Sequence, residues 1–243
     1  MSMSADRLLY LIFEAERMDM SQLQQATNQV GVMGQPLEVI PVGPLRVIAS
    51  PIPDRQVLRS PPMDAVLTFR SVVEAVFEAG PVVPLRFGTV TQSPAQAASL
   101  VREKKTPYLS LLHRLTGHVE MGVSVALEPE AMAEEEENVL QDTGRGDAGT
   151  ERPGTTYLRR QRERWVREQA RIEHAVAPIQ QAVTDQVGDA DMTAPTASEG
   201  RVSLAFLIPR DRVGPFRQAV KQVQTPGASS VEIVGPWAPY SFV

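Results

Sequence analysis

The chain has 243 residues, a formal net charge of −5 at pH 7 and a hydrophobic fraction of 42%, which is enough to build folded cores. The acidic balance argues against a general nucleic-acid-binding protein. The chain contains no cysteine, which excludes disulfides, thiolate nucleophiles, iron–sulfur clusters and zinc sites with thiolate ligands.

The beginning of the chain lacks the pattern of a signal peptide. Only the short apolar run Leu8 to Phe13 precedes Glu14 and Glu16, whereas a signal peptide needs a longer apolar core and a cleavage site of small residues. No stretch approaches the roughly 18 apolar residues of a membrane span. We therefore expect a soluble, cytoplasmic protein that does not act at a membrane.

Residues 1–117 alternate strand and helix patterns. The expected elements are a strand at 8–13, a helix at 18–30, a hairpin of strands at 37–42 and 45–49 around Gly43-Pro44, a helix at 63–79, a strand at 82–87, and a helix from Ser93-Pro94 to about Leu115 that Pro107 kinks or splits. The order up to Val90 resembles a ferredoxin-like split βαβ unit, with a helix added behind it. We expect an N-terminal α+β domain over 1–117, either a ferredoxin-like variant or an irregular α+β fold.

Residues 118–243 follow a similar order. Apolar side chains alternate with small or polar ones from Val119 to Leu127, which predicts a strand from His118. The other expected elements are an exposed loop at 128–153, a long helix at about 155–187 that Pro178 kinks, a polar loop at 189–200, a strand at 202–208, a short helix at 213–223 and a last strand at 231–234. We expect a second α+β domain over 118–243, built on an antiparallel or mixed sheet.

Residues that carry enzyme chemistry are scarce. His113 and His118 lie five residues apart with Glu120 nearby, which differs from the i, i+4 spacing of a helical zinc pair. The sequence has no phosphate-binding P-loop, no Gly-x-Gly-x-x-Gly after a strand and no Gly-x-Ser-x-Gly elbow. We predict no catalytic residue, no metal site and no cofactor, and a binding or structural protein rather than an enzyme.

The predicted long helix is rich in arginine. Seven arginines and four glutamates lie between Glu151 and Glu173, a net charge of +3. A solvated face with local ion pairs explains this pattern simply. The alternatives are a polar docking face anchored by arginines and Trp165, or RNA binding, which would depend steeply on salt but lacks aromatic stacking positions beside the arginines.

Two further segments stand out. Pro84-Leu85-Arg86-Phe87-Gly88-Thr89 is expected to be a strand end, with one large side chain on each face and Arg86 as a contact or ion-pair residue. Gly235-Pro236-Trp237-Ala238-Pro239-Tyr240-Ser241-Phe242-Val243 places three of the 13 aromatic residues in the last seven positions. A terminus of this composition either packs onto the protein or is presented to a partner.

Taken together, these segments resemble the gas vesicle protein F/L family (GvpF/GvpL). Val83 to Val90 is similar to the central motif of that family, and Gly235 to Val243 to its C-terminal motif, with Ala238 where proline is more usual. The Leu8 to Phe13 opening, the Gly117 to Val125 stretch and Thr156-Tyr157-Leu158 also fit, so the resemblance covers nearly the whole chain.

The resemblance implies a non-enzymatic accessory protein that takes part in gas vesicle assembly. It implies two α+β domains, the second a modified ferredoxin-like fold whose extended helix corresponds to 155–187. The implied partners are the small hydrophobic shell protein and other gas vesicle accessory proteins, without nucleic acid or membrane. The expected contact residues are Arg86, Phe87, Trp165, Trp237, Tyr240 and Phe242.

Two conditions keep alternatives open. If all three terminal aromatics are buried within their own domain, they are core residues and not contact residues. A ferredoxin-like small-molecule-binding or regulatory module, or an unfamiliar enzyme on that scaffold, would require a concave pocket with convergent polar groups.

Overall fold

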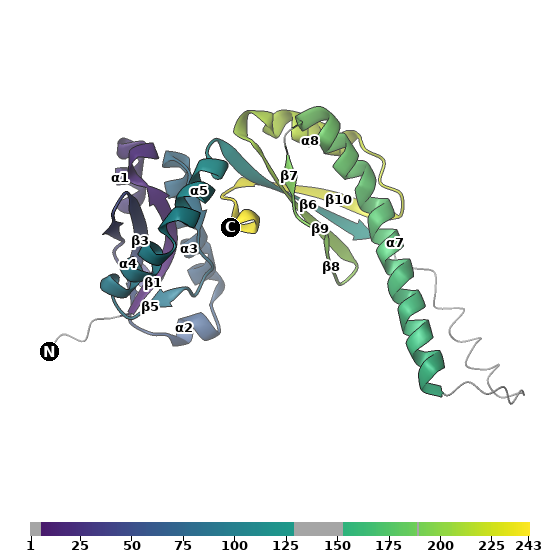
Figure 1. Ribbon diagram of the computed structural model, residues 1–243, viewed down its shortest axis with the longest axis horizontal. Helices are drawn as coiled ribbons and strands as arrows, with labels where there is room; N and C mark the ends of the chain where they lie inside the picture. Colours follow the sequence, from purple (N-terminus) through teal and green to yellow (C-terminus); the bar gives the residue numbers. More distant parts are fainter. Residues whose placement is uncertain (1–5, 129–152, 189) are drawn as a thin grey trace, which may run out of the picture. The chain divides into compact units, whose positions relative to one another are not determined.

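The structure is a computed structural model that describes residues 6–128, 153–188 and 190–243 (Figure 1). The chain forms two compact units. Unit 1 comprises Met1–Glu120, Leu207–Arg210 and Gly235–Val243, and unit 2 comprises Met121–Phe206 and Asp211–Val234. The last nine residues therefore belong to the same unit as the N-terminal half. The domains predicted from the sequence, 1–117 and 118–243, place them instead with the C-terminal half.

Unit 1 is built on a five-stranded sheet. Its strands are β1 (Asp6–Glu14), β2 (Glu38–Val42), β3 (Leu45–Ile52), β4 (Val82–Pro84) and β5 (Val90–Thr91). The order is β2-β3-β1-β4, with β5 also on β1, and the pairs are antiparallel. Leu8 to Phe13 are at most 2% exposed, because β1 lies at the centre with both faces covered. This explains its unbroken apolar sequence.

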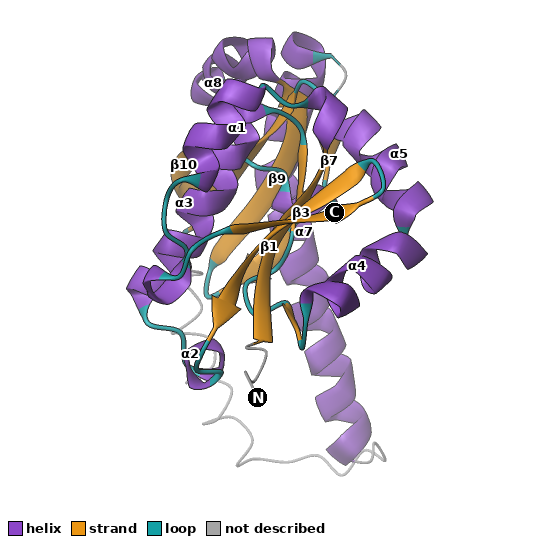
Figure 2. Cartoon of the chain, turned by 90° about the vertical axis from the view of Figure 1, so that its left-hand side faces the viewer, coloured by secondary structure: helices purple, strands orange, loops and turns teal. Residues whose placement is uncertain are grey.

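Helices cover both faces of this sheet. They are η1 (Ala15–Arg17), α1 (Met20–Thr27), η2 (Val32–Gly34), α2 (Gln56–Arg59), α3 (Met63–Ala79), α4 (Pro94–Glu103) and α5 (Lys105–Leu115). Figure 2 shows α1 and α3 on one side of β1 and β3, and α4 and α5 on the other. Leu9, Ile12 and Val83 of the sheet pack with Val101, Leu112 and Leu115 of α4 and α5 in one core cluster.

Local chemistry sets the ends of these helices. Asp19 accepts hydrogen bonds from the backbone N–H groups of Ser21 and Gln22, so α1 begins at Met20, two residues later than the sequence pattern predicts. The predicted helix after Ser93 is split, as expected, but at Lys104 and not at Pro107. Pro107 thereby falls in the first turn of α5, where its missing N–H costs no helical hydrogen bond.

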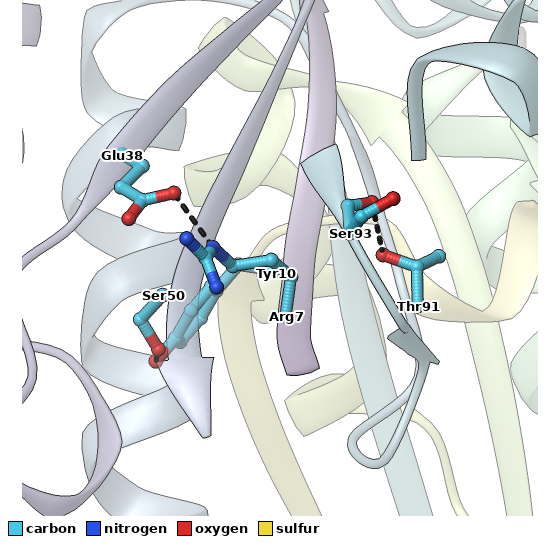
Figure 3. A network of polar contacts seen from close by, with 6 residues as sticks. All are labelled: Arg7, Tyr10, Glu38, Ser50, Thr91 and Ser93. Carbon is cyan, nitrogen blue, oxygen red and sulfur yellow. Dashed lines mark hydrogen bonds and ion pairs between the residues drawn. The ribbon is translucent and has the colours of Figure 1, made fainter. Parts of the chain in front are cut away.

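Buried polar groups in unit 1 are satisfied by one another. The Tyr10 hydroxyl lies 3.0 Å from the Ser50 hydroxyl and accepts a hydrogen bond from the Val32 N–H at 2.9 Å. Figure 3 shows the Tyr10–Ser50 pair below the ion pair of Arg7 with Glu38, with the Thr91 hydroxyl bond to the Ser93 carbonyl to the right of both. Among the described residues, no buried side-chain nitrogen or oxygen lacks a partner, as expected of a well-packed core.

Unit 2 contains most of a second five-stranded sheet. Its strands are β6 (His118–Leu127), β7 (Asp191–Met192), β8 (Thr196–Ser198), β9 (Arg201–Pro209) and β10 (Ala228–Trp237). The order is β10-β6-β9-β7, with β8 on β9. Val119, Met121, Val123 and Val125 of β6 are at most 1% exposed, while the alternate residues Gly122, Ser124 and Ala126 are half-buried. The predicted alternation is therefore confirmed.

Two helices cover the buried face of this sheet, α7 (Pro153–Val187) and α8 (Val213–Gln222), the latter preceded by η3 (Arg210–Arg212). Phe206 of β9 packs edge-to-face on Phe216 of α8, with ring centroids 5.3 Å apart. The chain ends with η4 (Tyr240–Phe242). Sheets of antiparallel pairs together with separate helices confirm the α+β class.

Two predictions for residues 118–243 differ from the structure, and a third is not tested by it. The polar stretch 189–200 was expected to be a loop, but it contains β7 and β8, whose exposed residues lack an apolar alternation. The last strand is longer than 231–234 and runs to Trp237. The expected loop at 128–153 falls almost entirely outside the described residues.

Candidate functional site

The segment Leu85–Thr89, here called the motif loop, bulges out of the edge of the first sheet. Strands β4 and β5 on either side of it both pair with β1, through Pro84 opposite Leu11 and Val90 opposite Leu8. Five residues, 85–89, therefore lie between these two pairs, whereas β1 has only two residues between them, Leu9 and Tyr10. The predicted strand at 82–87 is wrong beyond Pro84.

A turn holds the motif loop in place. The Thr89 N–H and hydroxyl both donate to the Arg86 carbonyl, at 3.1 and 2.7 Å. Gly88 has φ +90°, a left-handed conformation that favours glycine. Because a turn interrupts the strand here, Arg86 and Phe87 do not project from opposite faces of a strand. Both reach the same hollow in unit 1.

The tail, Gly235–Val243, is bound to unit 1 by two carboxylates. The Ala238 N–H donates to Oε1 of Glu74 at 3.2 Å. The Ser241 N–H and hydroxyl both donate to Glu120, each at 2.7 Å. Ala238 and Pro239 are buried, so the middle of the tail is a packed part of the unit and not a frayed end.

The motif loop and the tail meet at one hollow of about 450 Å³, here called the motif cavity. It lies entirely within unit 1. Its lining residues are Val66, Phe69, Arg70, Glu74, Arg86, Phe87, Glu120, Trp237 and Tyr240. Two segments about 150 residues apart in sequence, each singled out by its composition, are thus brought together by the fold.

Aromatic contacts build the walls of the motif cavity. Phe87 of the motif loop meets Phe69 edge-to-face at 5.3 Å between centroids, and Phe69 stacks on Tyr10 at 4.7 Å. The Arg70 guanidinium lies 4.2 Å from the Trp237 ring centroid, within range of a cation–π interaction. Helix α3 therefore contacts both segments. Its Phe69 packs on the motif loop, and its Arg70 packs on the tail.

The polar groups of the motif cavity have shifted acid–base properties. Burial raises the pKa of Glu74, although the Ala238 N–H and the charge of Arg70 oppose the rise. Burial, together with the nearby carboxylate of Glu74, also raises the pKa of Tyr240, so its phenol stays protonated at neutral pH. Arg86 is exposed, and among the described residues its guanidinium has no ion-pair partner.

Four of the six predicted contact residues line the motif cavity, and two lie elsewhere. Phe242 packs against the core cluster that includes Leu112 and Leu115. Trp165 belongs to unit 2, on α7, and is 64% exposed. Trp237, Tyr240 and Phe242 are each half-buried, so the condition that would have made all three plain core residues is not met.

Sequence reasoning missed the contribution of α3 and the role of Glu120. Val66, Arg70 and Glu74 recur at every fourth position, the spacing that places side chains on one face of a helix. That pattern was available in the sequence, but it does not reveal that the motif loop and the tail lie beside this face. In the sequence, Glu120 stands beside the histidines and within the Gly117 to Val125 stretch, and neither context indicates a contact with the tail.

The chemistry of the motif cavity suits binding. Its walls are mainly apolar and aromatic, with charged groups at a few points, as in sites that accept apolar side chains or small molecules. Over 6–128, 153–188 and 190–243, no three histidine or acidic side chains gather as a metal-binding group. In the same ranges, no helix has the length and hydropathy to cross a bilayer.

Comparison with known proteins places the chain in a family context. The family model described as "Gas vesicle synthesis protein GvpL/GvpF" matches residues 7–243. Gas vesicle protein L from Streptomyces sp. (strain CB03234) is 28% identical over 260 residues, covering 99% of this chain and 94% of that protein. Gas vesicle protein F from the same strain is 26% identical over 241 residues, covering 96% and 98%.

Solved structures share the fold. The crystal structure of GvpF from Anabaena sp. PCC7120 matches with a TM-score of 0.68 at 17% identity, covering 98% of this chain and 96% of that one. The crystal structure of GvpF from Microcystis aeruginosa matches with a TM-score of 0.68 at 18% identity, covering 98% of each. At these identities the likeness concerns the fold.

Proposed function

Since the chain belongs to the GvpL/GvpF family of gas vesicle synthesis proteins, we propose that it is a non-enzymatic accessory protein that binds the hydrophobic shell protein during gas vesicle assembly. The motif cavity is the proposed contact surface. Other accessory proteins of the gas vesicle are the next candidates for the same surface. The protein would act in the cytoplasm and at the growing vesicle.

One observation carries this proposal: the motif loop and the tail converge on a single apolar hollow. Had they served only to stabilise the fold, Phe87, Trp237 and Tyr240 could all be fully buried. Instead each is half-buried and keeps part of its surface towards solvent. Half-exposed aromatic side chains around a hollow are typical of surfaces that bind another protein.

The size of the motif cavity indicates a weak, reversible contact. A hollow of about 450 Å³ holds a few side chains of a partner. Burying a Leu- or Phe-sized side chain contributes about 1.5–3 kcal/mol, and association costs at least about 4 kcal/mol. Two buried side chains therefore contribute about 3–6 kcal/mol, which is close to the lower limit of that cost. A contact of this size is weak, which suits a factor that must release the shell protein into the growing wall.

Shape and charge suit an apolar partner segment that carries an acidic group near one end. The walls contributed by Val66, Phe69 and Phe87 are apolar, while Arg86 offers a cation that no described carboxylate neutralises. A carboxylate of the partner beside Arg86 would form a charge-assisted hydrogen bond. Its neighbouring apolar side chains would then fill the hollow.

The proposed architecture is a ferredoxin-like variant at 1–117, in preference to an irregular α+β fold, and a modified ferredoxin-like domain at 118–243. Support comes from the sheet orders β2-β3-β1-β4 and β10-β6-β9-β7. In the first sheet, β2 follows the first helix and lies at the opposite end from β4. In the second sheet, β7 follows α7 and lies at the opposite end from β10. Both arrangements are those of a split βαβ unit. The 35-residue helix α7 would be the extension that modifies the second copy.

The proposal is tested by gas vesicle formation in a host that carries the complete gene cluster with variants of this chain. Phe87→Ser and Trp237→Ser should each reduce the number of vesicles at least tenfold. Leu100→Ser, at a 48%-exposed leucine of α4 outside the motif cavity, is the matched control and should leave vesicle number unchanged. Normal vesicle formation with both cavity variants, at unchanged protein levels, would contradict the proposed function.

The motif cavity also supports a second candidate, a small-molecule-binding regulatory module. Arg70, Glu74, Arg86 and Glu120 converge on the hollow, as such a module requires. This alternative predicts that a metabolite from a cell extract copurifies with the native protein and not with Phe87→Ser. Mass spectrometry of the heat-released fraction distinguishes the two candidates.

A further inference from the structure

The apolar stripe of α7 continues beyond the part of the helix that its own unit covers. Ile172, Val176 and Ile179 are at most 6% exposed and pack in the core of unit 2. Leu158 and Trp165 precede Ile172 at intervals of seven residues, which keeps them within about 40° of it around the helix. Yet Leu158 is 68% and Trp165 64% exposed.

The exposure follows from the length of the helix. At about 1.5 Å per residue, 35 residues extend for roughly 50 Å. Within unit 2, Figure 1 shows the first half of α7 running past the ends of β6 and β8. The sheet therefore does not cover the first half of the stripe, although the heptad spacing of its apolar residues continues there.

Positive charge surrounds the uncovered part of the stripe. Between Leu158 and Arg171 the sequence has six arginines and two glutamates, a net charge of +4 on a chain whose total is −5. Arg162 and Arg167 line a shallow groove with Val166, itself 50% exposed. Neither arginine has an ion-pair partner among the described residues.

We propose that residues 158–171 of α7 form a docking surface for an acidic amphipathic helix of a partner protein. This surface, here called the α7 stripe, is separate from the motif cavity and does not depend on the function proposed for it. Leu158 and Trp165 would pack between apolar residues of the partner helix at heptad spacing. Arg162 and Arg167 would pair with glutamates or aspartates that flank the partner's apolar seam.

Charge decides against a second copy of this chain. Two α7 stripes packed on each other would bring together two segments of net charge +4, and like charges flanking a helix–helix seam are destabilising. A membrane surface is disfavoured because interfacial helices need a broad apolar face, whereas this stripe offers two large side chains in 14 residues. RNA would require several stacking side chains, and Trp165 is the single aromatic residue between Leu158 and Arg171.

Trp165 provides the readout. The chain has two tryptophans, so Trp237→Phe leaves Trp165 as the sole fluorophore. The probe is a synthetic 21-residue helical peptide with leucine at the a and d positions of three heptads and glutamate at e and g. On adding it, we expect a blue shift of Trp165 emission and saturable binding that weakens at least tenfold between 50 and 300 mM salt.

Matched variants separate the apolar and charged contributions. Measured by calorimetry in the native background, Leu158→Ser and Trp165→Ser should each weaken peptide binding at least tenfold, and Arg162→Gln with Arg167→Gln about tenfold together at 50 mM salt. Leu100→Ser should bind like the native protein. A peptide with its leucines replaced by serine should not bind; equal binding by that peptide would show a merely electrostatic attraction and overturn the proposal.

The other occupants give distinct results, each of which would also overturn the proposal. A blue shift that grows with protein concentration alone would identify a second copy. A shift with phosphatidylglycerol vesicles or oligouridylate, at concentrations where the acidic peptide gives none, would identify a membrane or RNA. A red shift on replacing Glu134 to Glu137 by glutamine, without peptide, would show that the chain's own acidic segment occupies the stripe.

Discussion

The Glu120 carboxylate accepts two hydrogen bonds from Ser241, one from the backbone N–H and one from the hydroxyl, both at 2.7 Å. The two residues are 121 positions apart, and Glu120 is only 8% exposed. A buried carboxylate at the start of β6 thereby fixes the end of the chain to unit 1. The positions of Trp237 and Tyr240 in the motif cavity depend on this connection.

Removing the Glu120 carboxylate should loosen the tail and destabilise unit 1. Hydrogen bonds to charged groups contribute about 1.5–3 kcal/mol, so we expect Glu120→Ala to lower the free energy of unfolding in urea by about 2 kcal/mol. Amide exchange of residues 238–243 should accelerate. Glu103→Ala, at an exposed carboxylate with only a 3.4 Å contact to Ser99, is the control. If both variants match the native protein, Glu120 does not hold the tail.

Stability should depend on the ionisation of Glu74. Burial raises the pKa of this carboxyl in the folded protein above its ordinary value of 4.5. The folded state therefore binds the proton more tightly than the unfolded state, and ionised Glu74 lowers the free energy of unfolding at pH values above the raised pKa. This loss disappears as the pH falls through the raised pKa to below 4.5.

Glu74→Gln should therefore be more stable than the native protein at pH 7.5, and the difference should shrink towards zero at pH 4. The glutamine oxygen can still accept the Ala238 hydrogen bond. Urea unfolding of both proteins at the two pH values measures the effect. Glu78→Gln, which loses an exposed ion pair to Arg210, should bring no gain at pH 7.5. A constant difference for Glu74→Gln at both pH values would contradict the assignment.

Gly80 and Gly214 should respond differently to alanine. A Cβ at Gly80 would lie 2.7 Å from the Arg17 carbonyl oxygen, and because backbone cannot move aside cheaply, we expect Gly80→Ala to cost about 2 kcal/mol. A Cβ at Gly214 would meet no atom beyond the chain neighbours of the glycine. Gly214 lies in the first turn of α8 directly before Pro215, where a Cβ disfavours the helical backbone, so Gly214→Ala should change the free energy of unfolding by less than about 0.5 kcal/mol. Urea unfolding of both variants tests the packing between α3 and the segment before α1.

Much of the fold could be predicted because local signals agree with the tertiary structure. The helix expected at 63–79 and the strand expected at 118–127 have those bounds, since apolar periodicity, Gly80-Pro81 and Gly117 all act locally. The exposed strands β7 and β8 escaped detection because an edge strand that buries no face needs no alternation. Strand β4 ends at Pro84, where the motif loop begins. No pattern within 82–87 indicates this early end.

The sequence predicts most residues of the candidate site, but it does not predict that they lie together. Composition and the family resemblance singled out Arg86, Phe87, Trp237 and Tyr240, and all four line one hollow. Their convergence requires the chain to pass through unit 2 and return to unit 1 at Gly235. No local pattern in a single sequence shows that the end of the chain packs on its first half. The same limit explains why Phe242, predicted as a contact residue with the other four, instead packs against the core cluster that includes Leu112 and Leu115.

The most direct test is binding of the purified protein to immobilised gas vesicle shell protein, followed by biolayer interferometry. The motif cavity predicts that the double variant Phe87→Ser/Trp237→Ser loses at least tenfold in affinity, while Leu100→Ser binds like the native protein, with all three proteins folded by circular dichroism. Binding of the double variant within twofold of the native affinity would show that the shell protein does not contact the motif cavity.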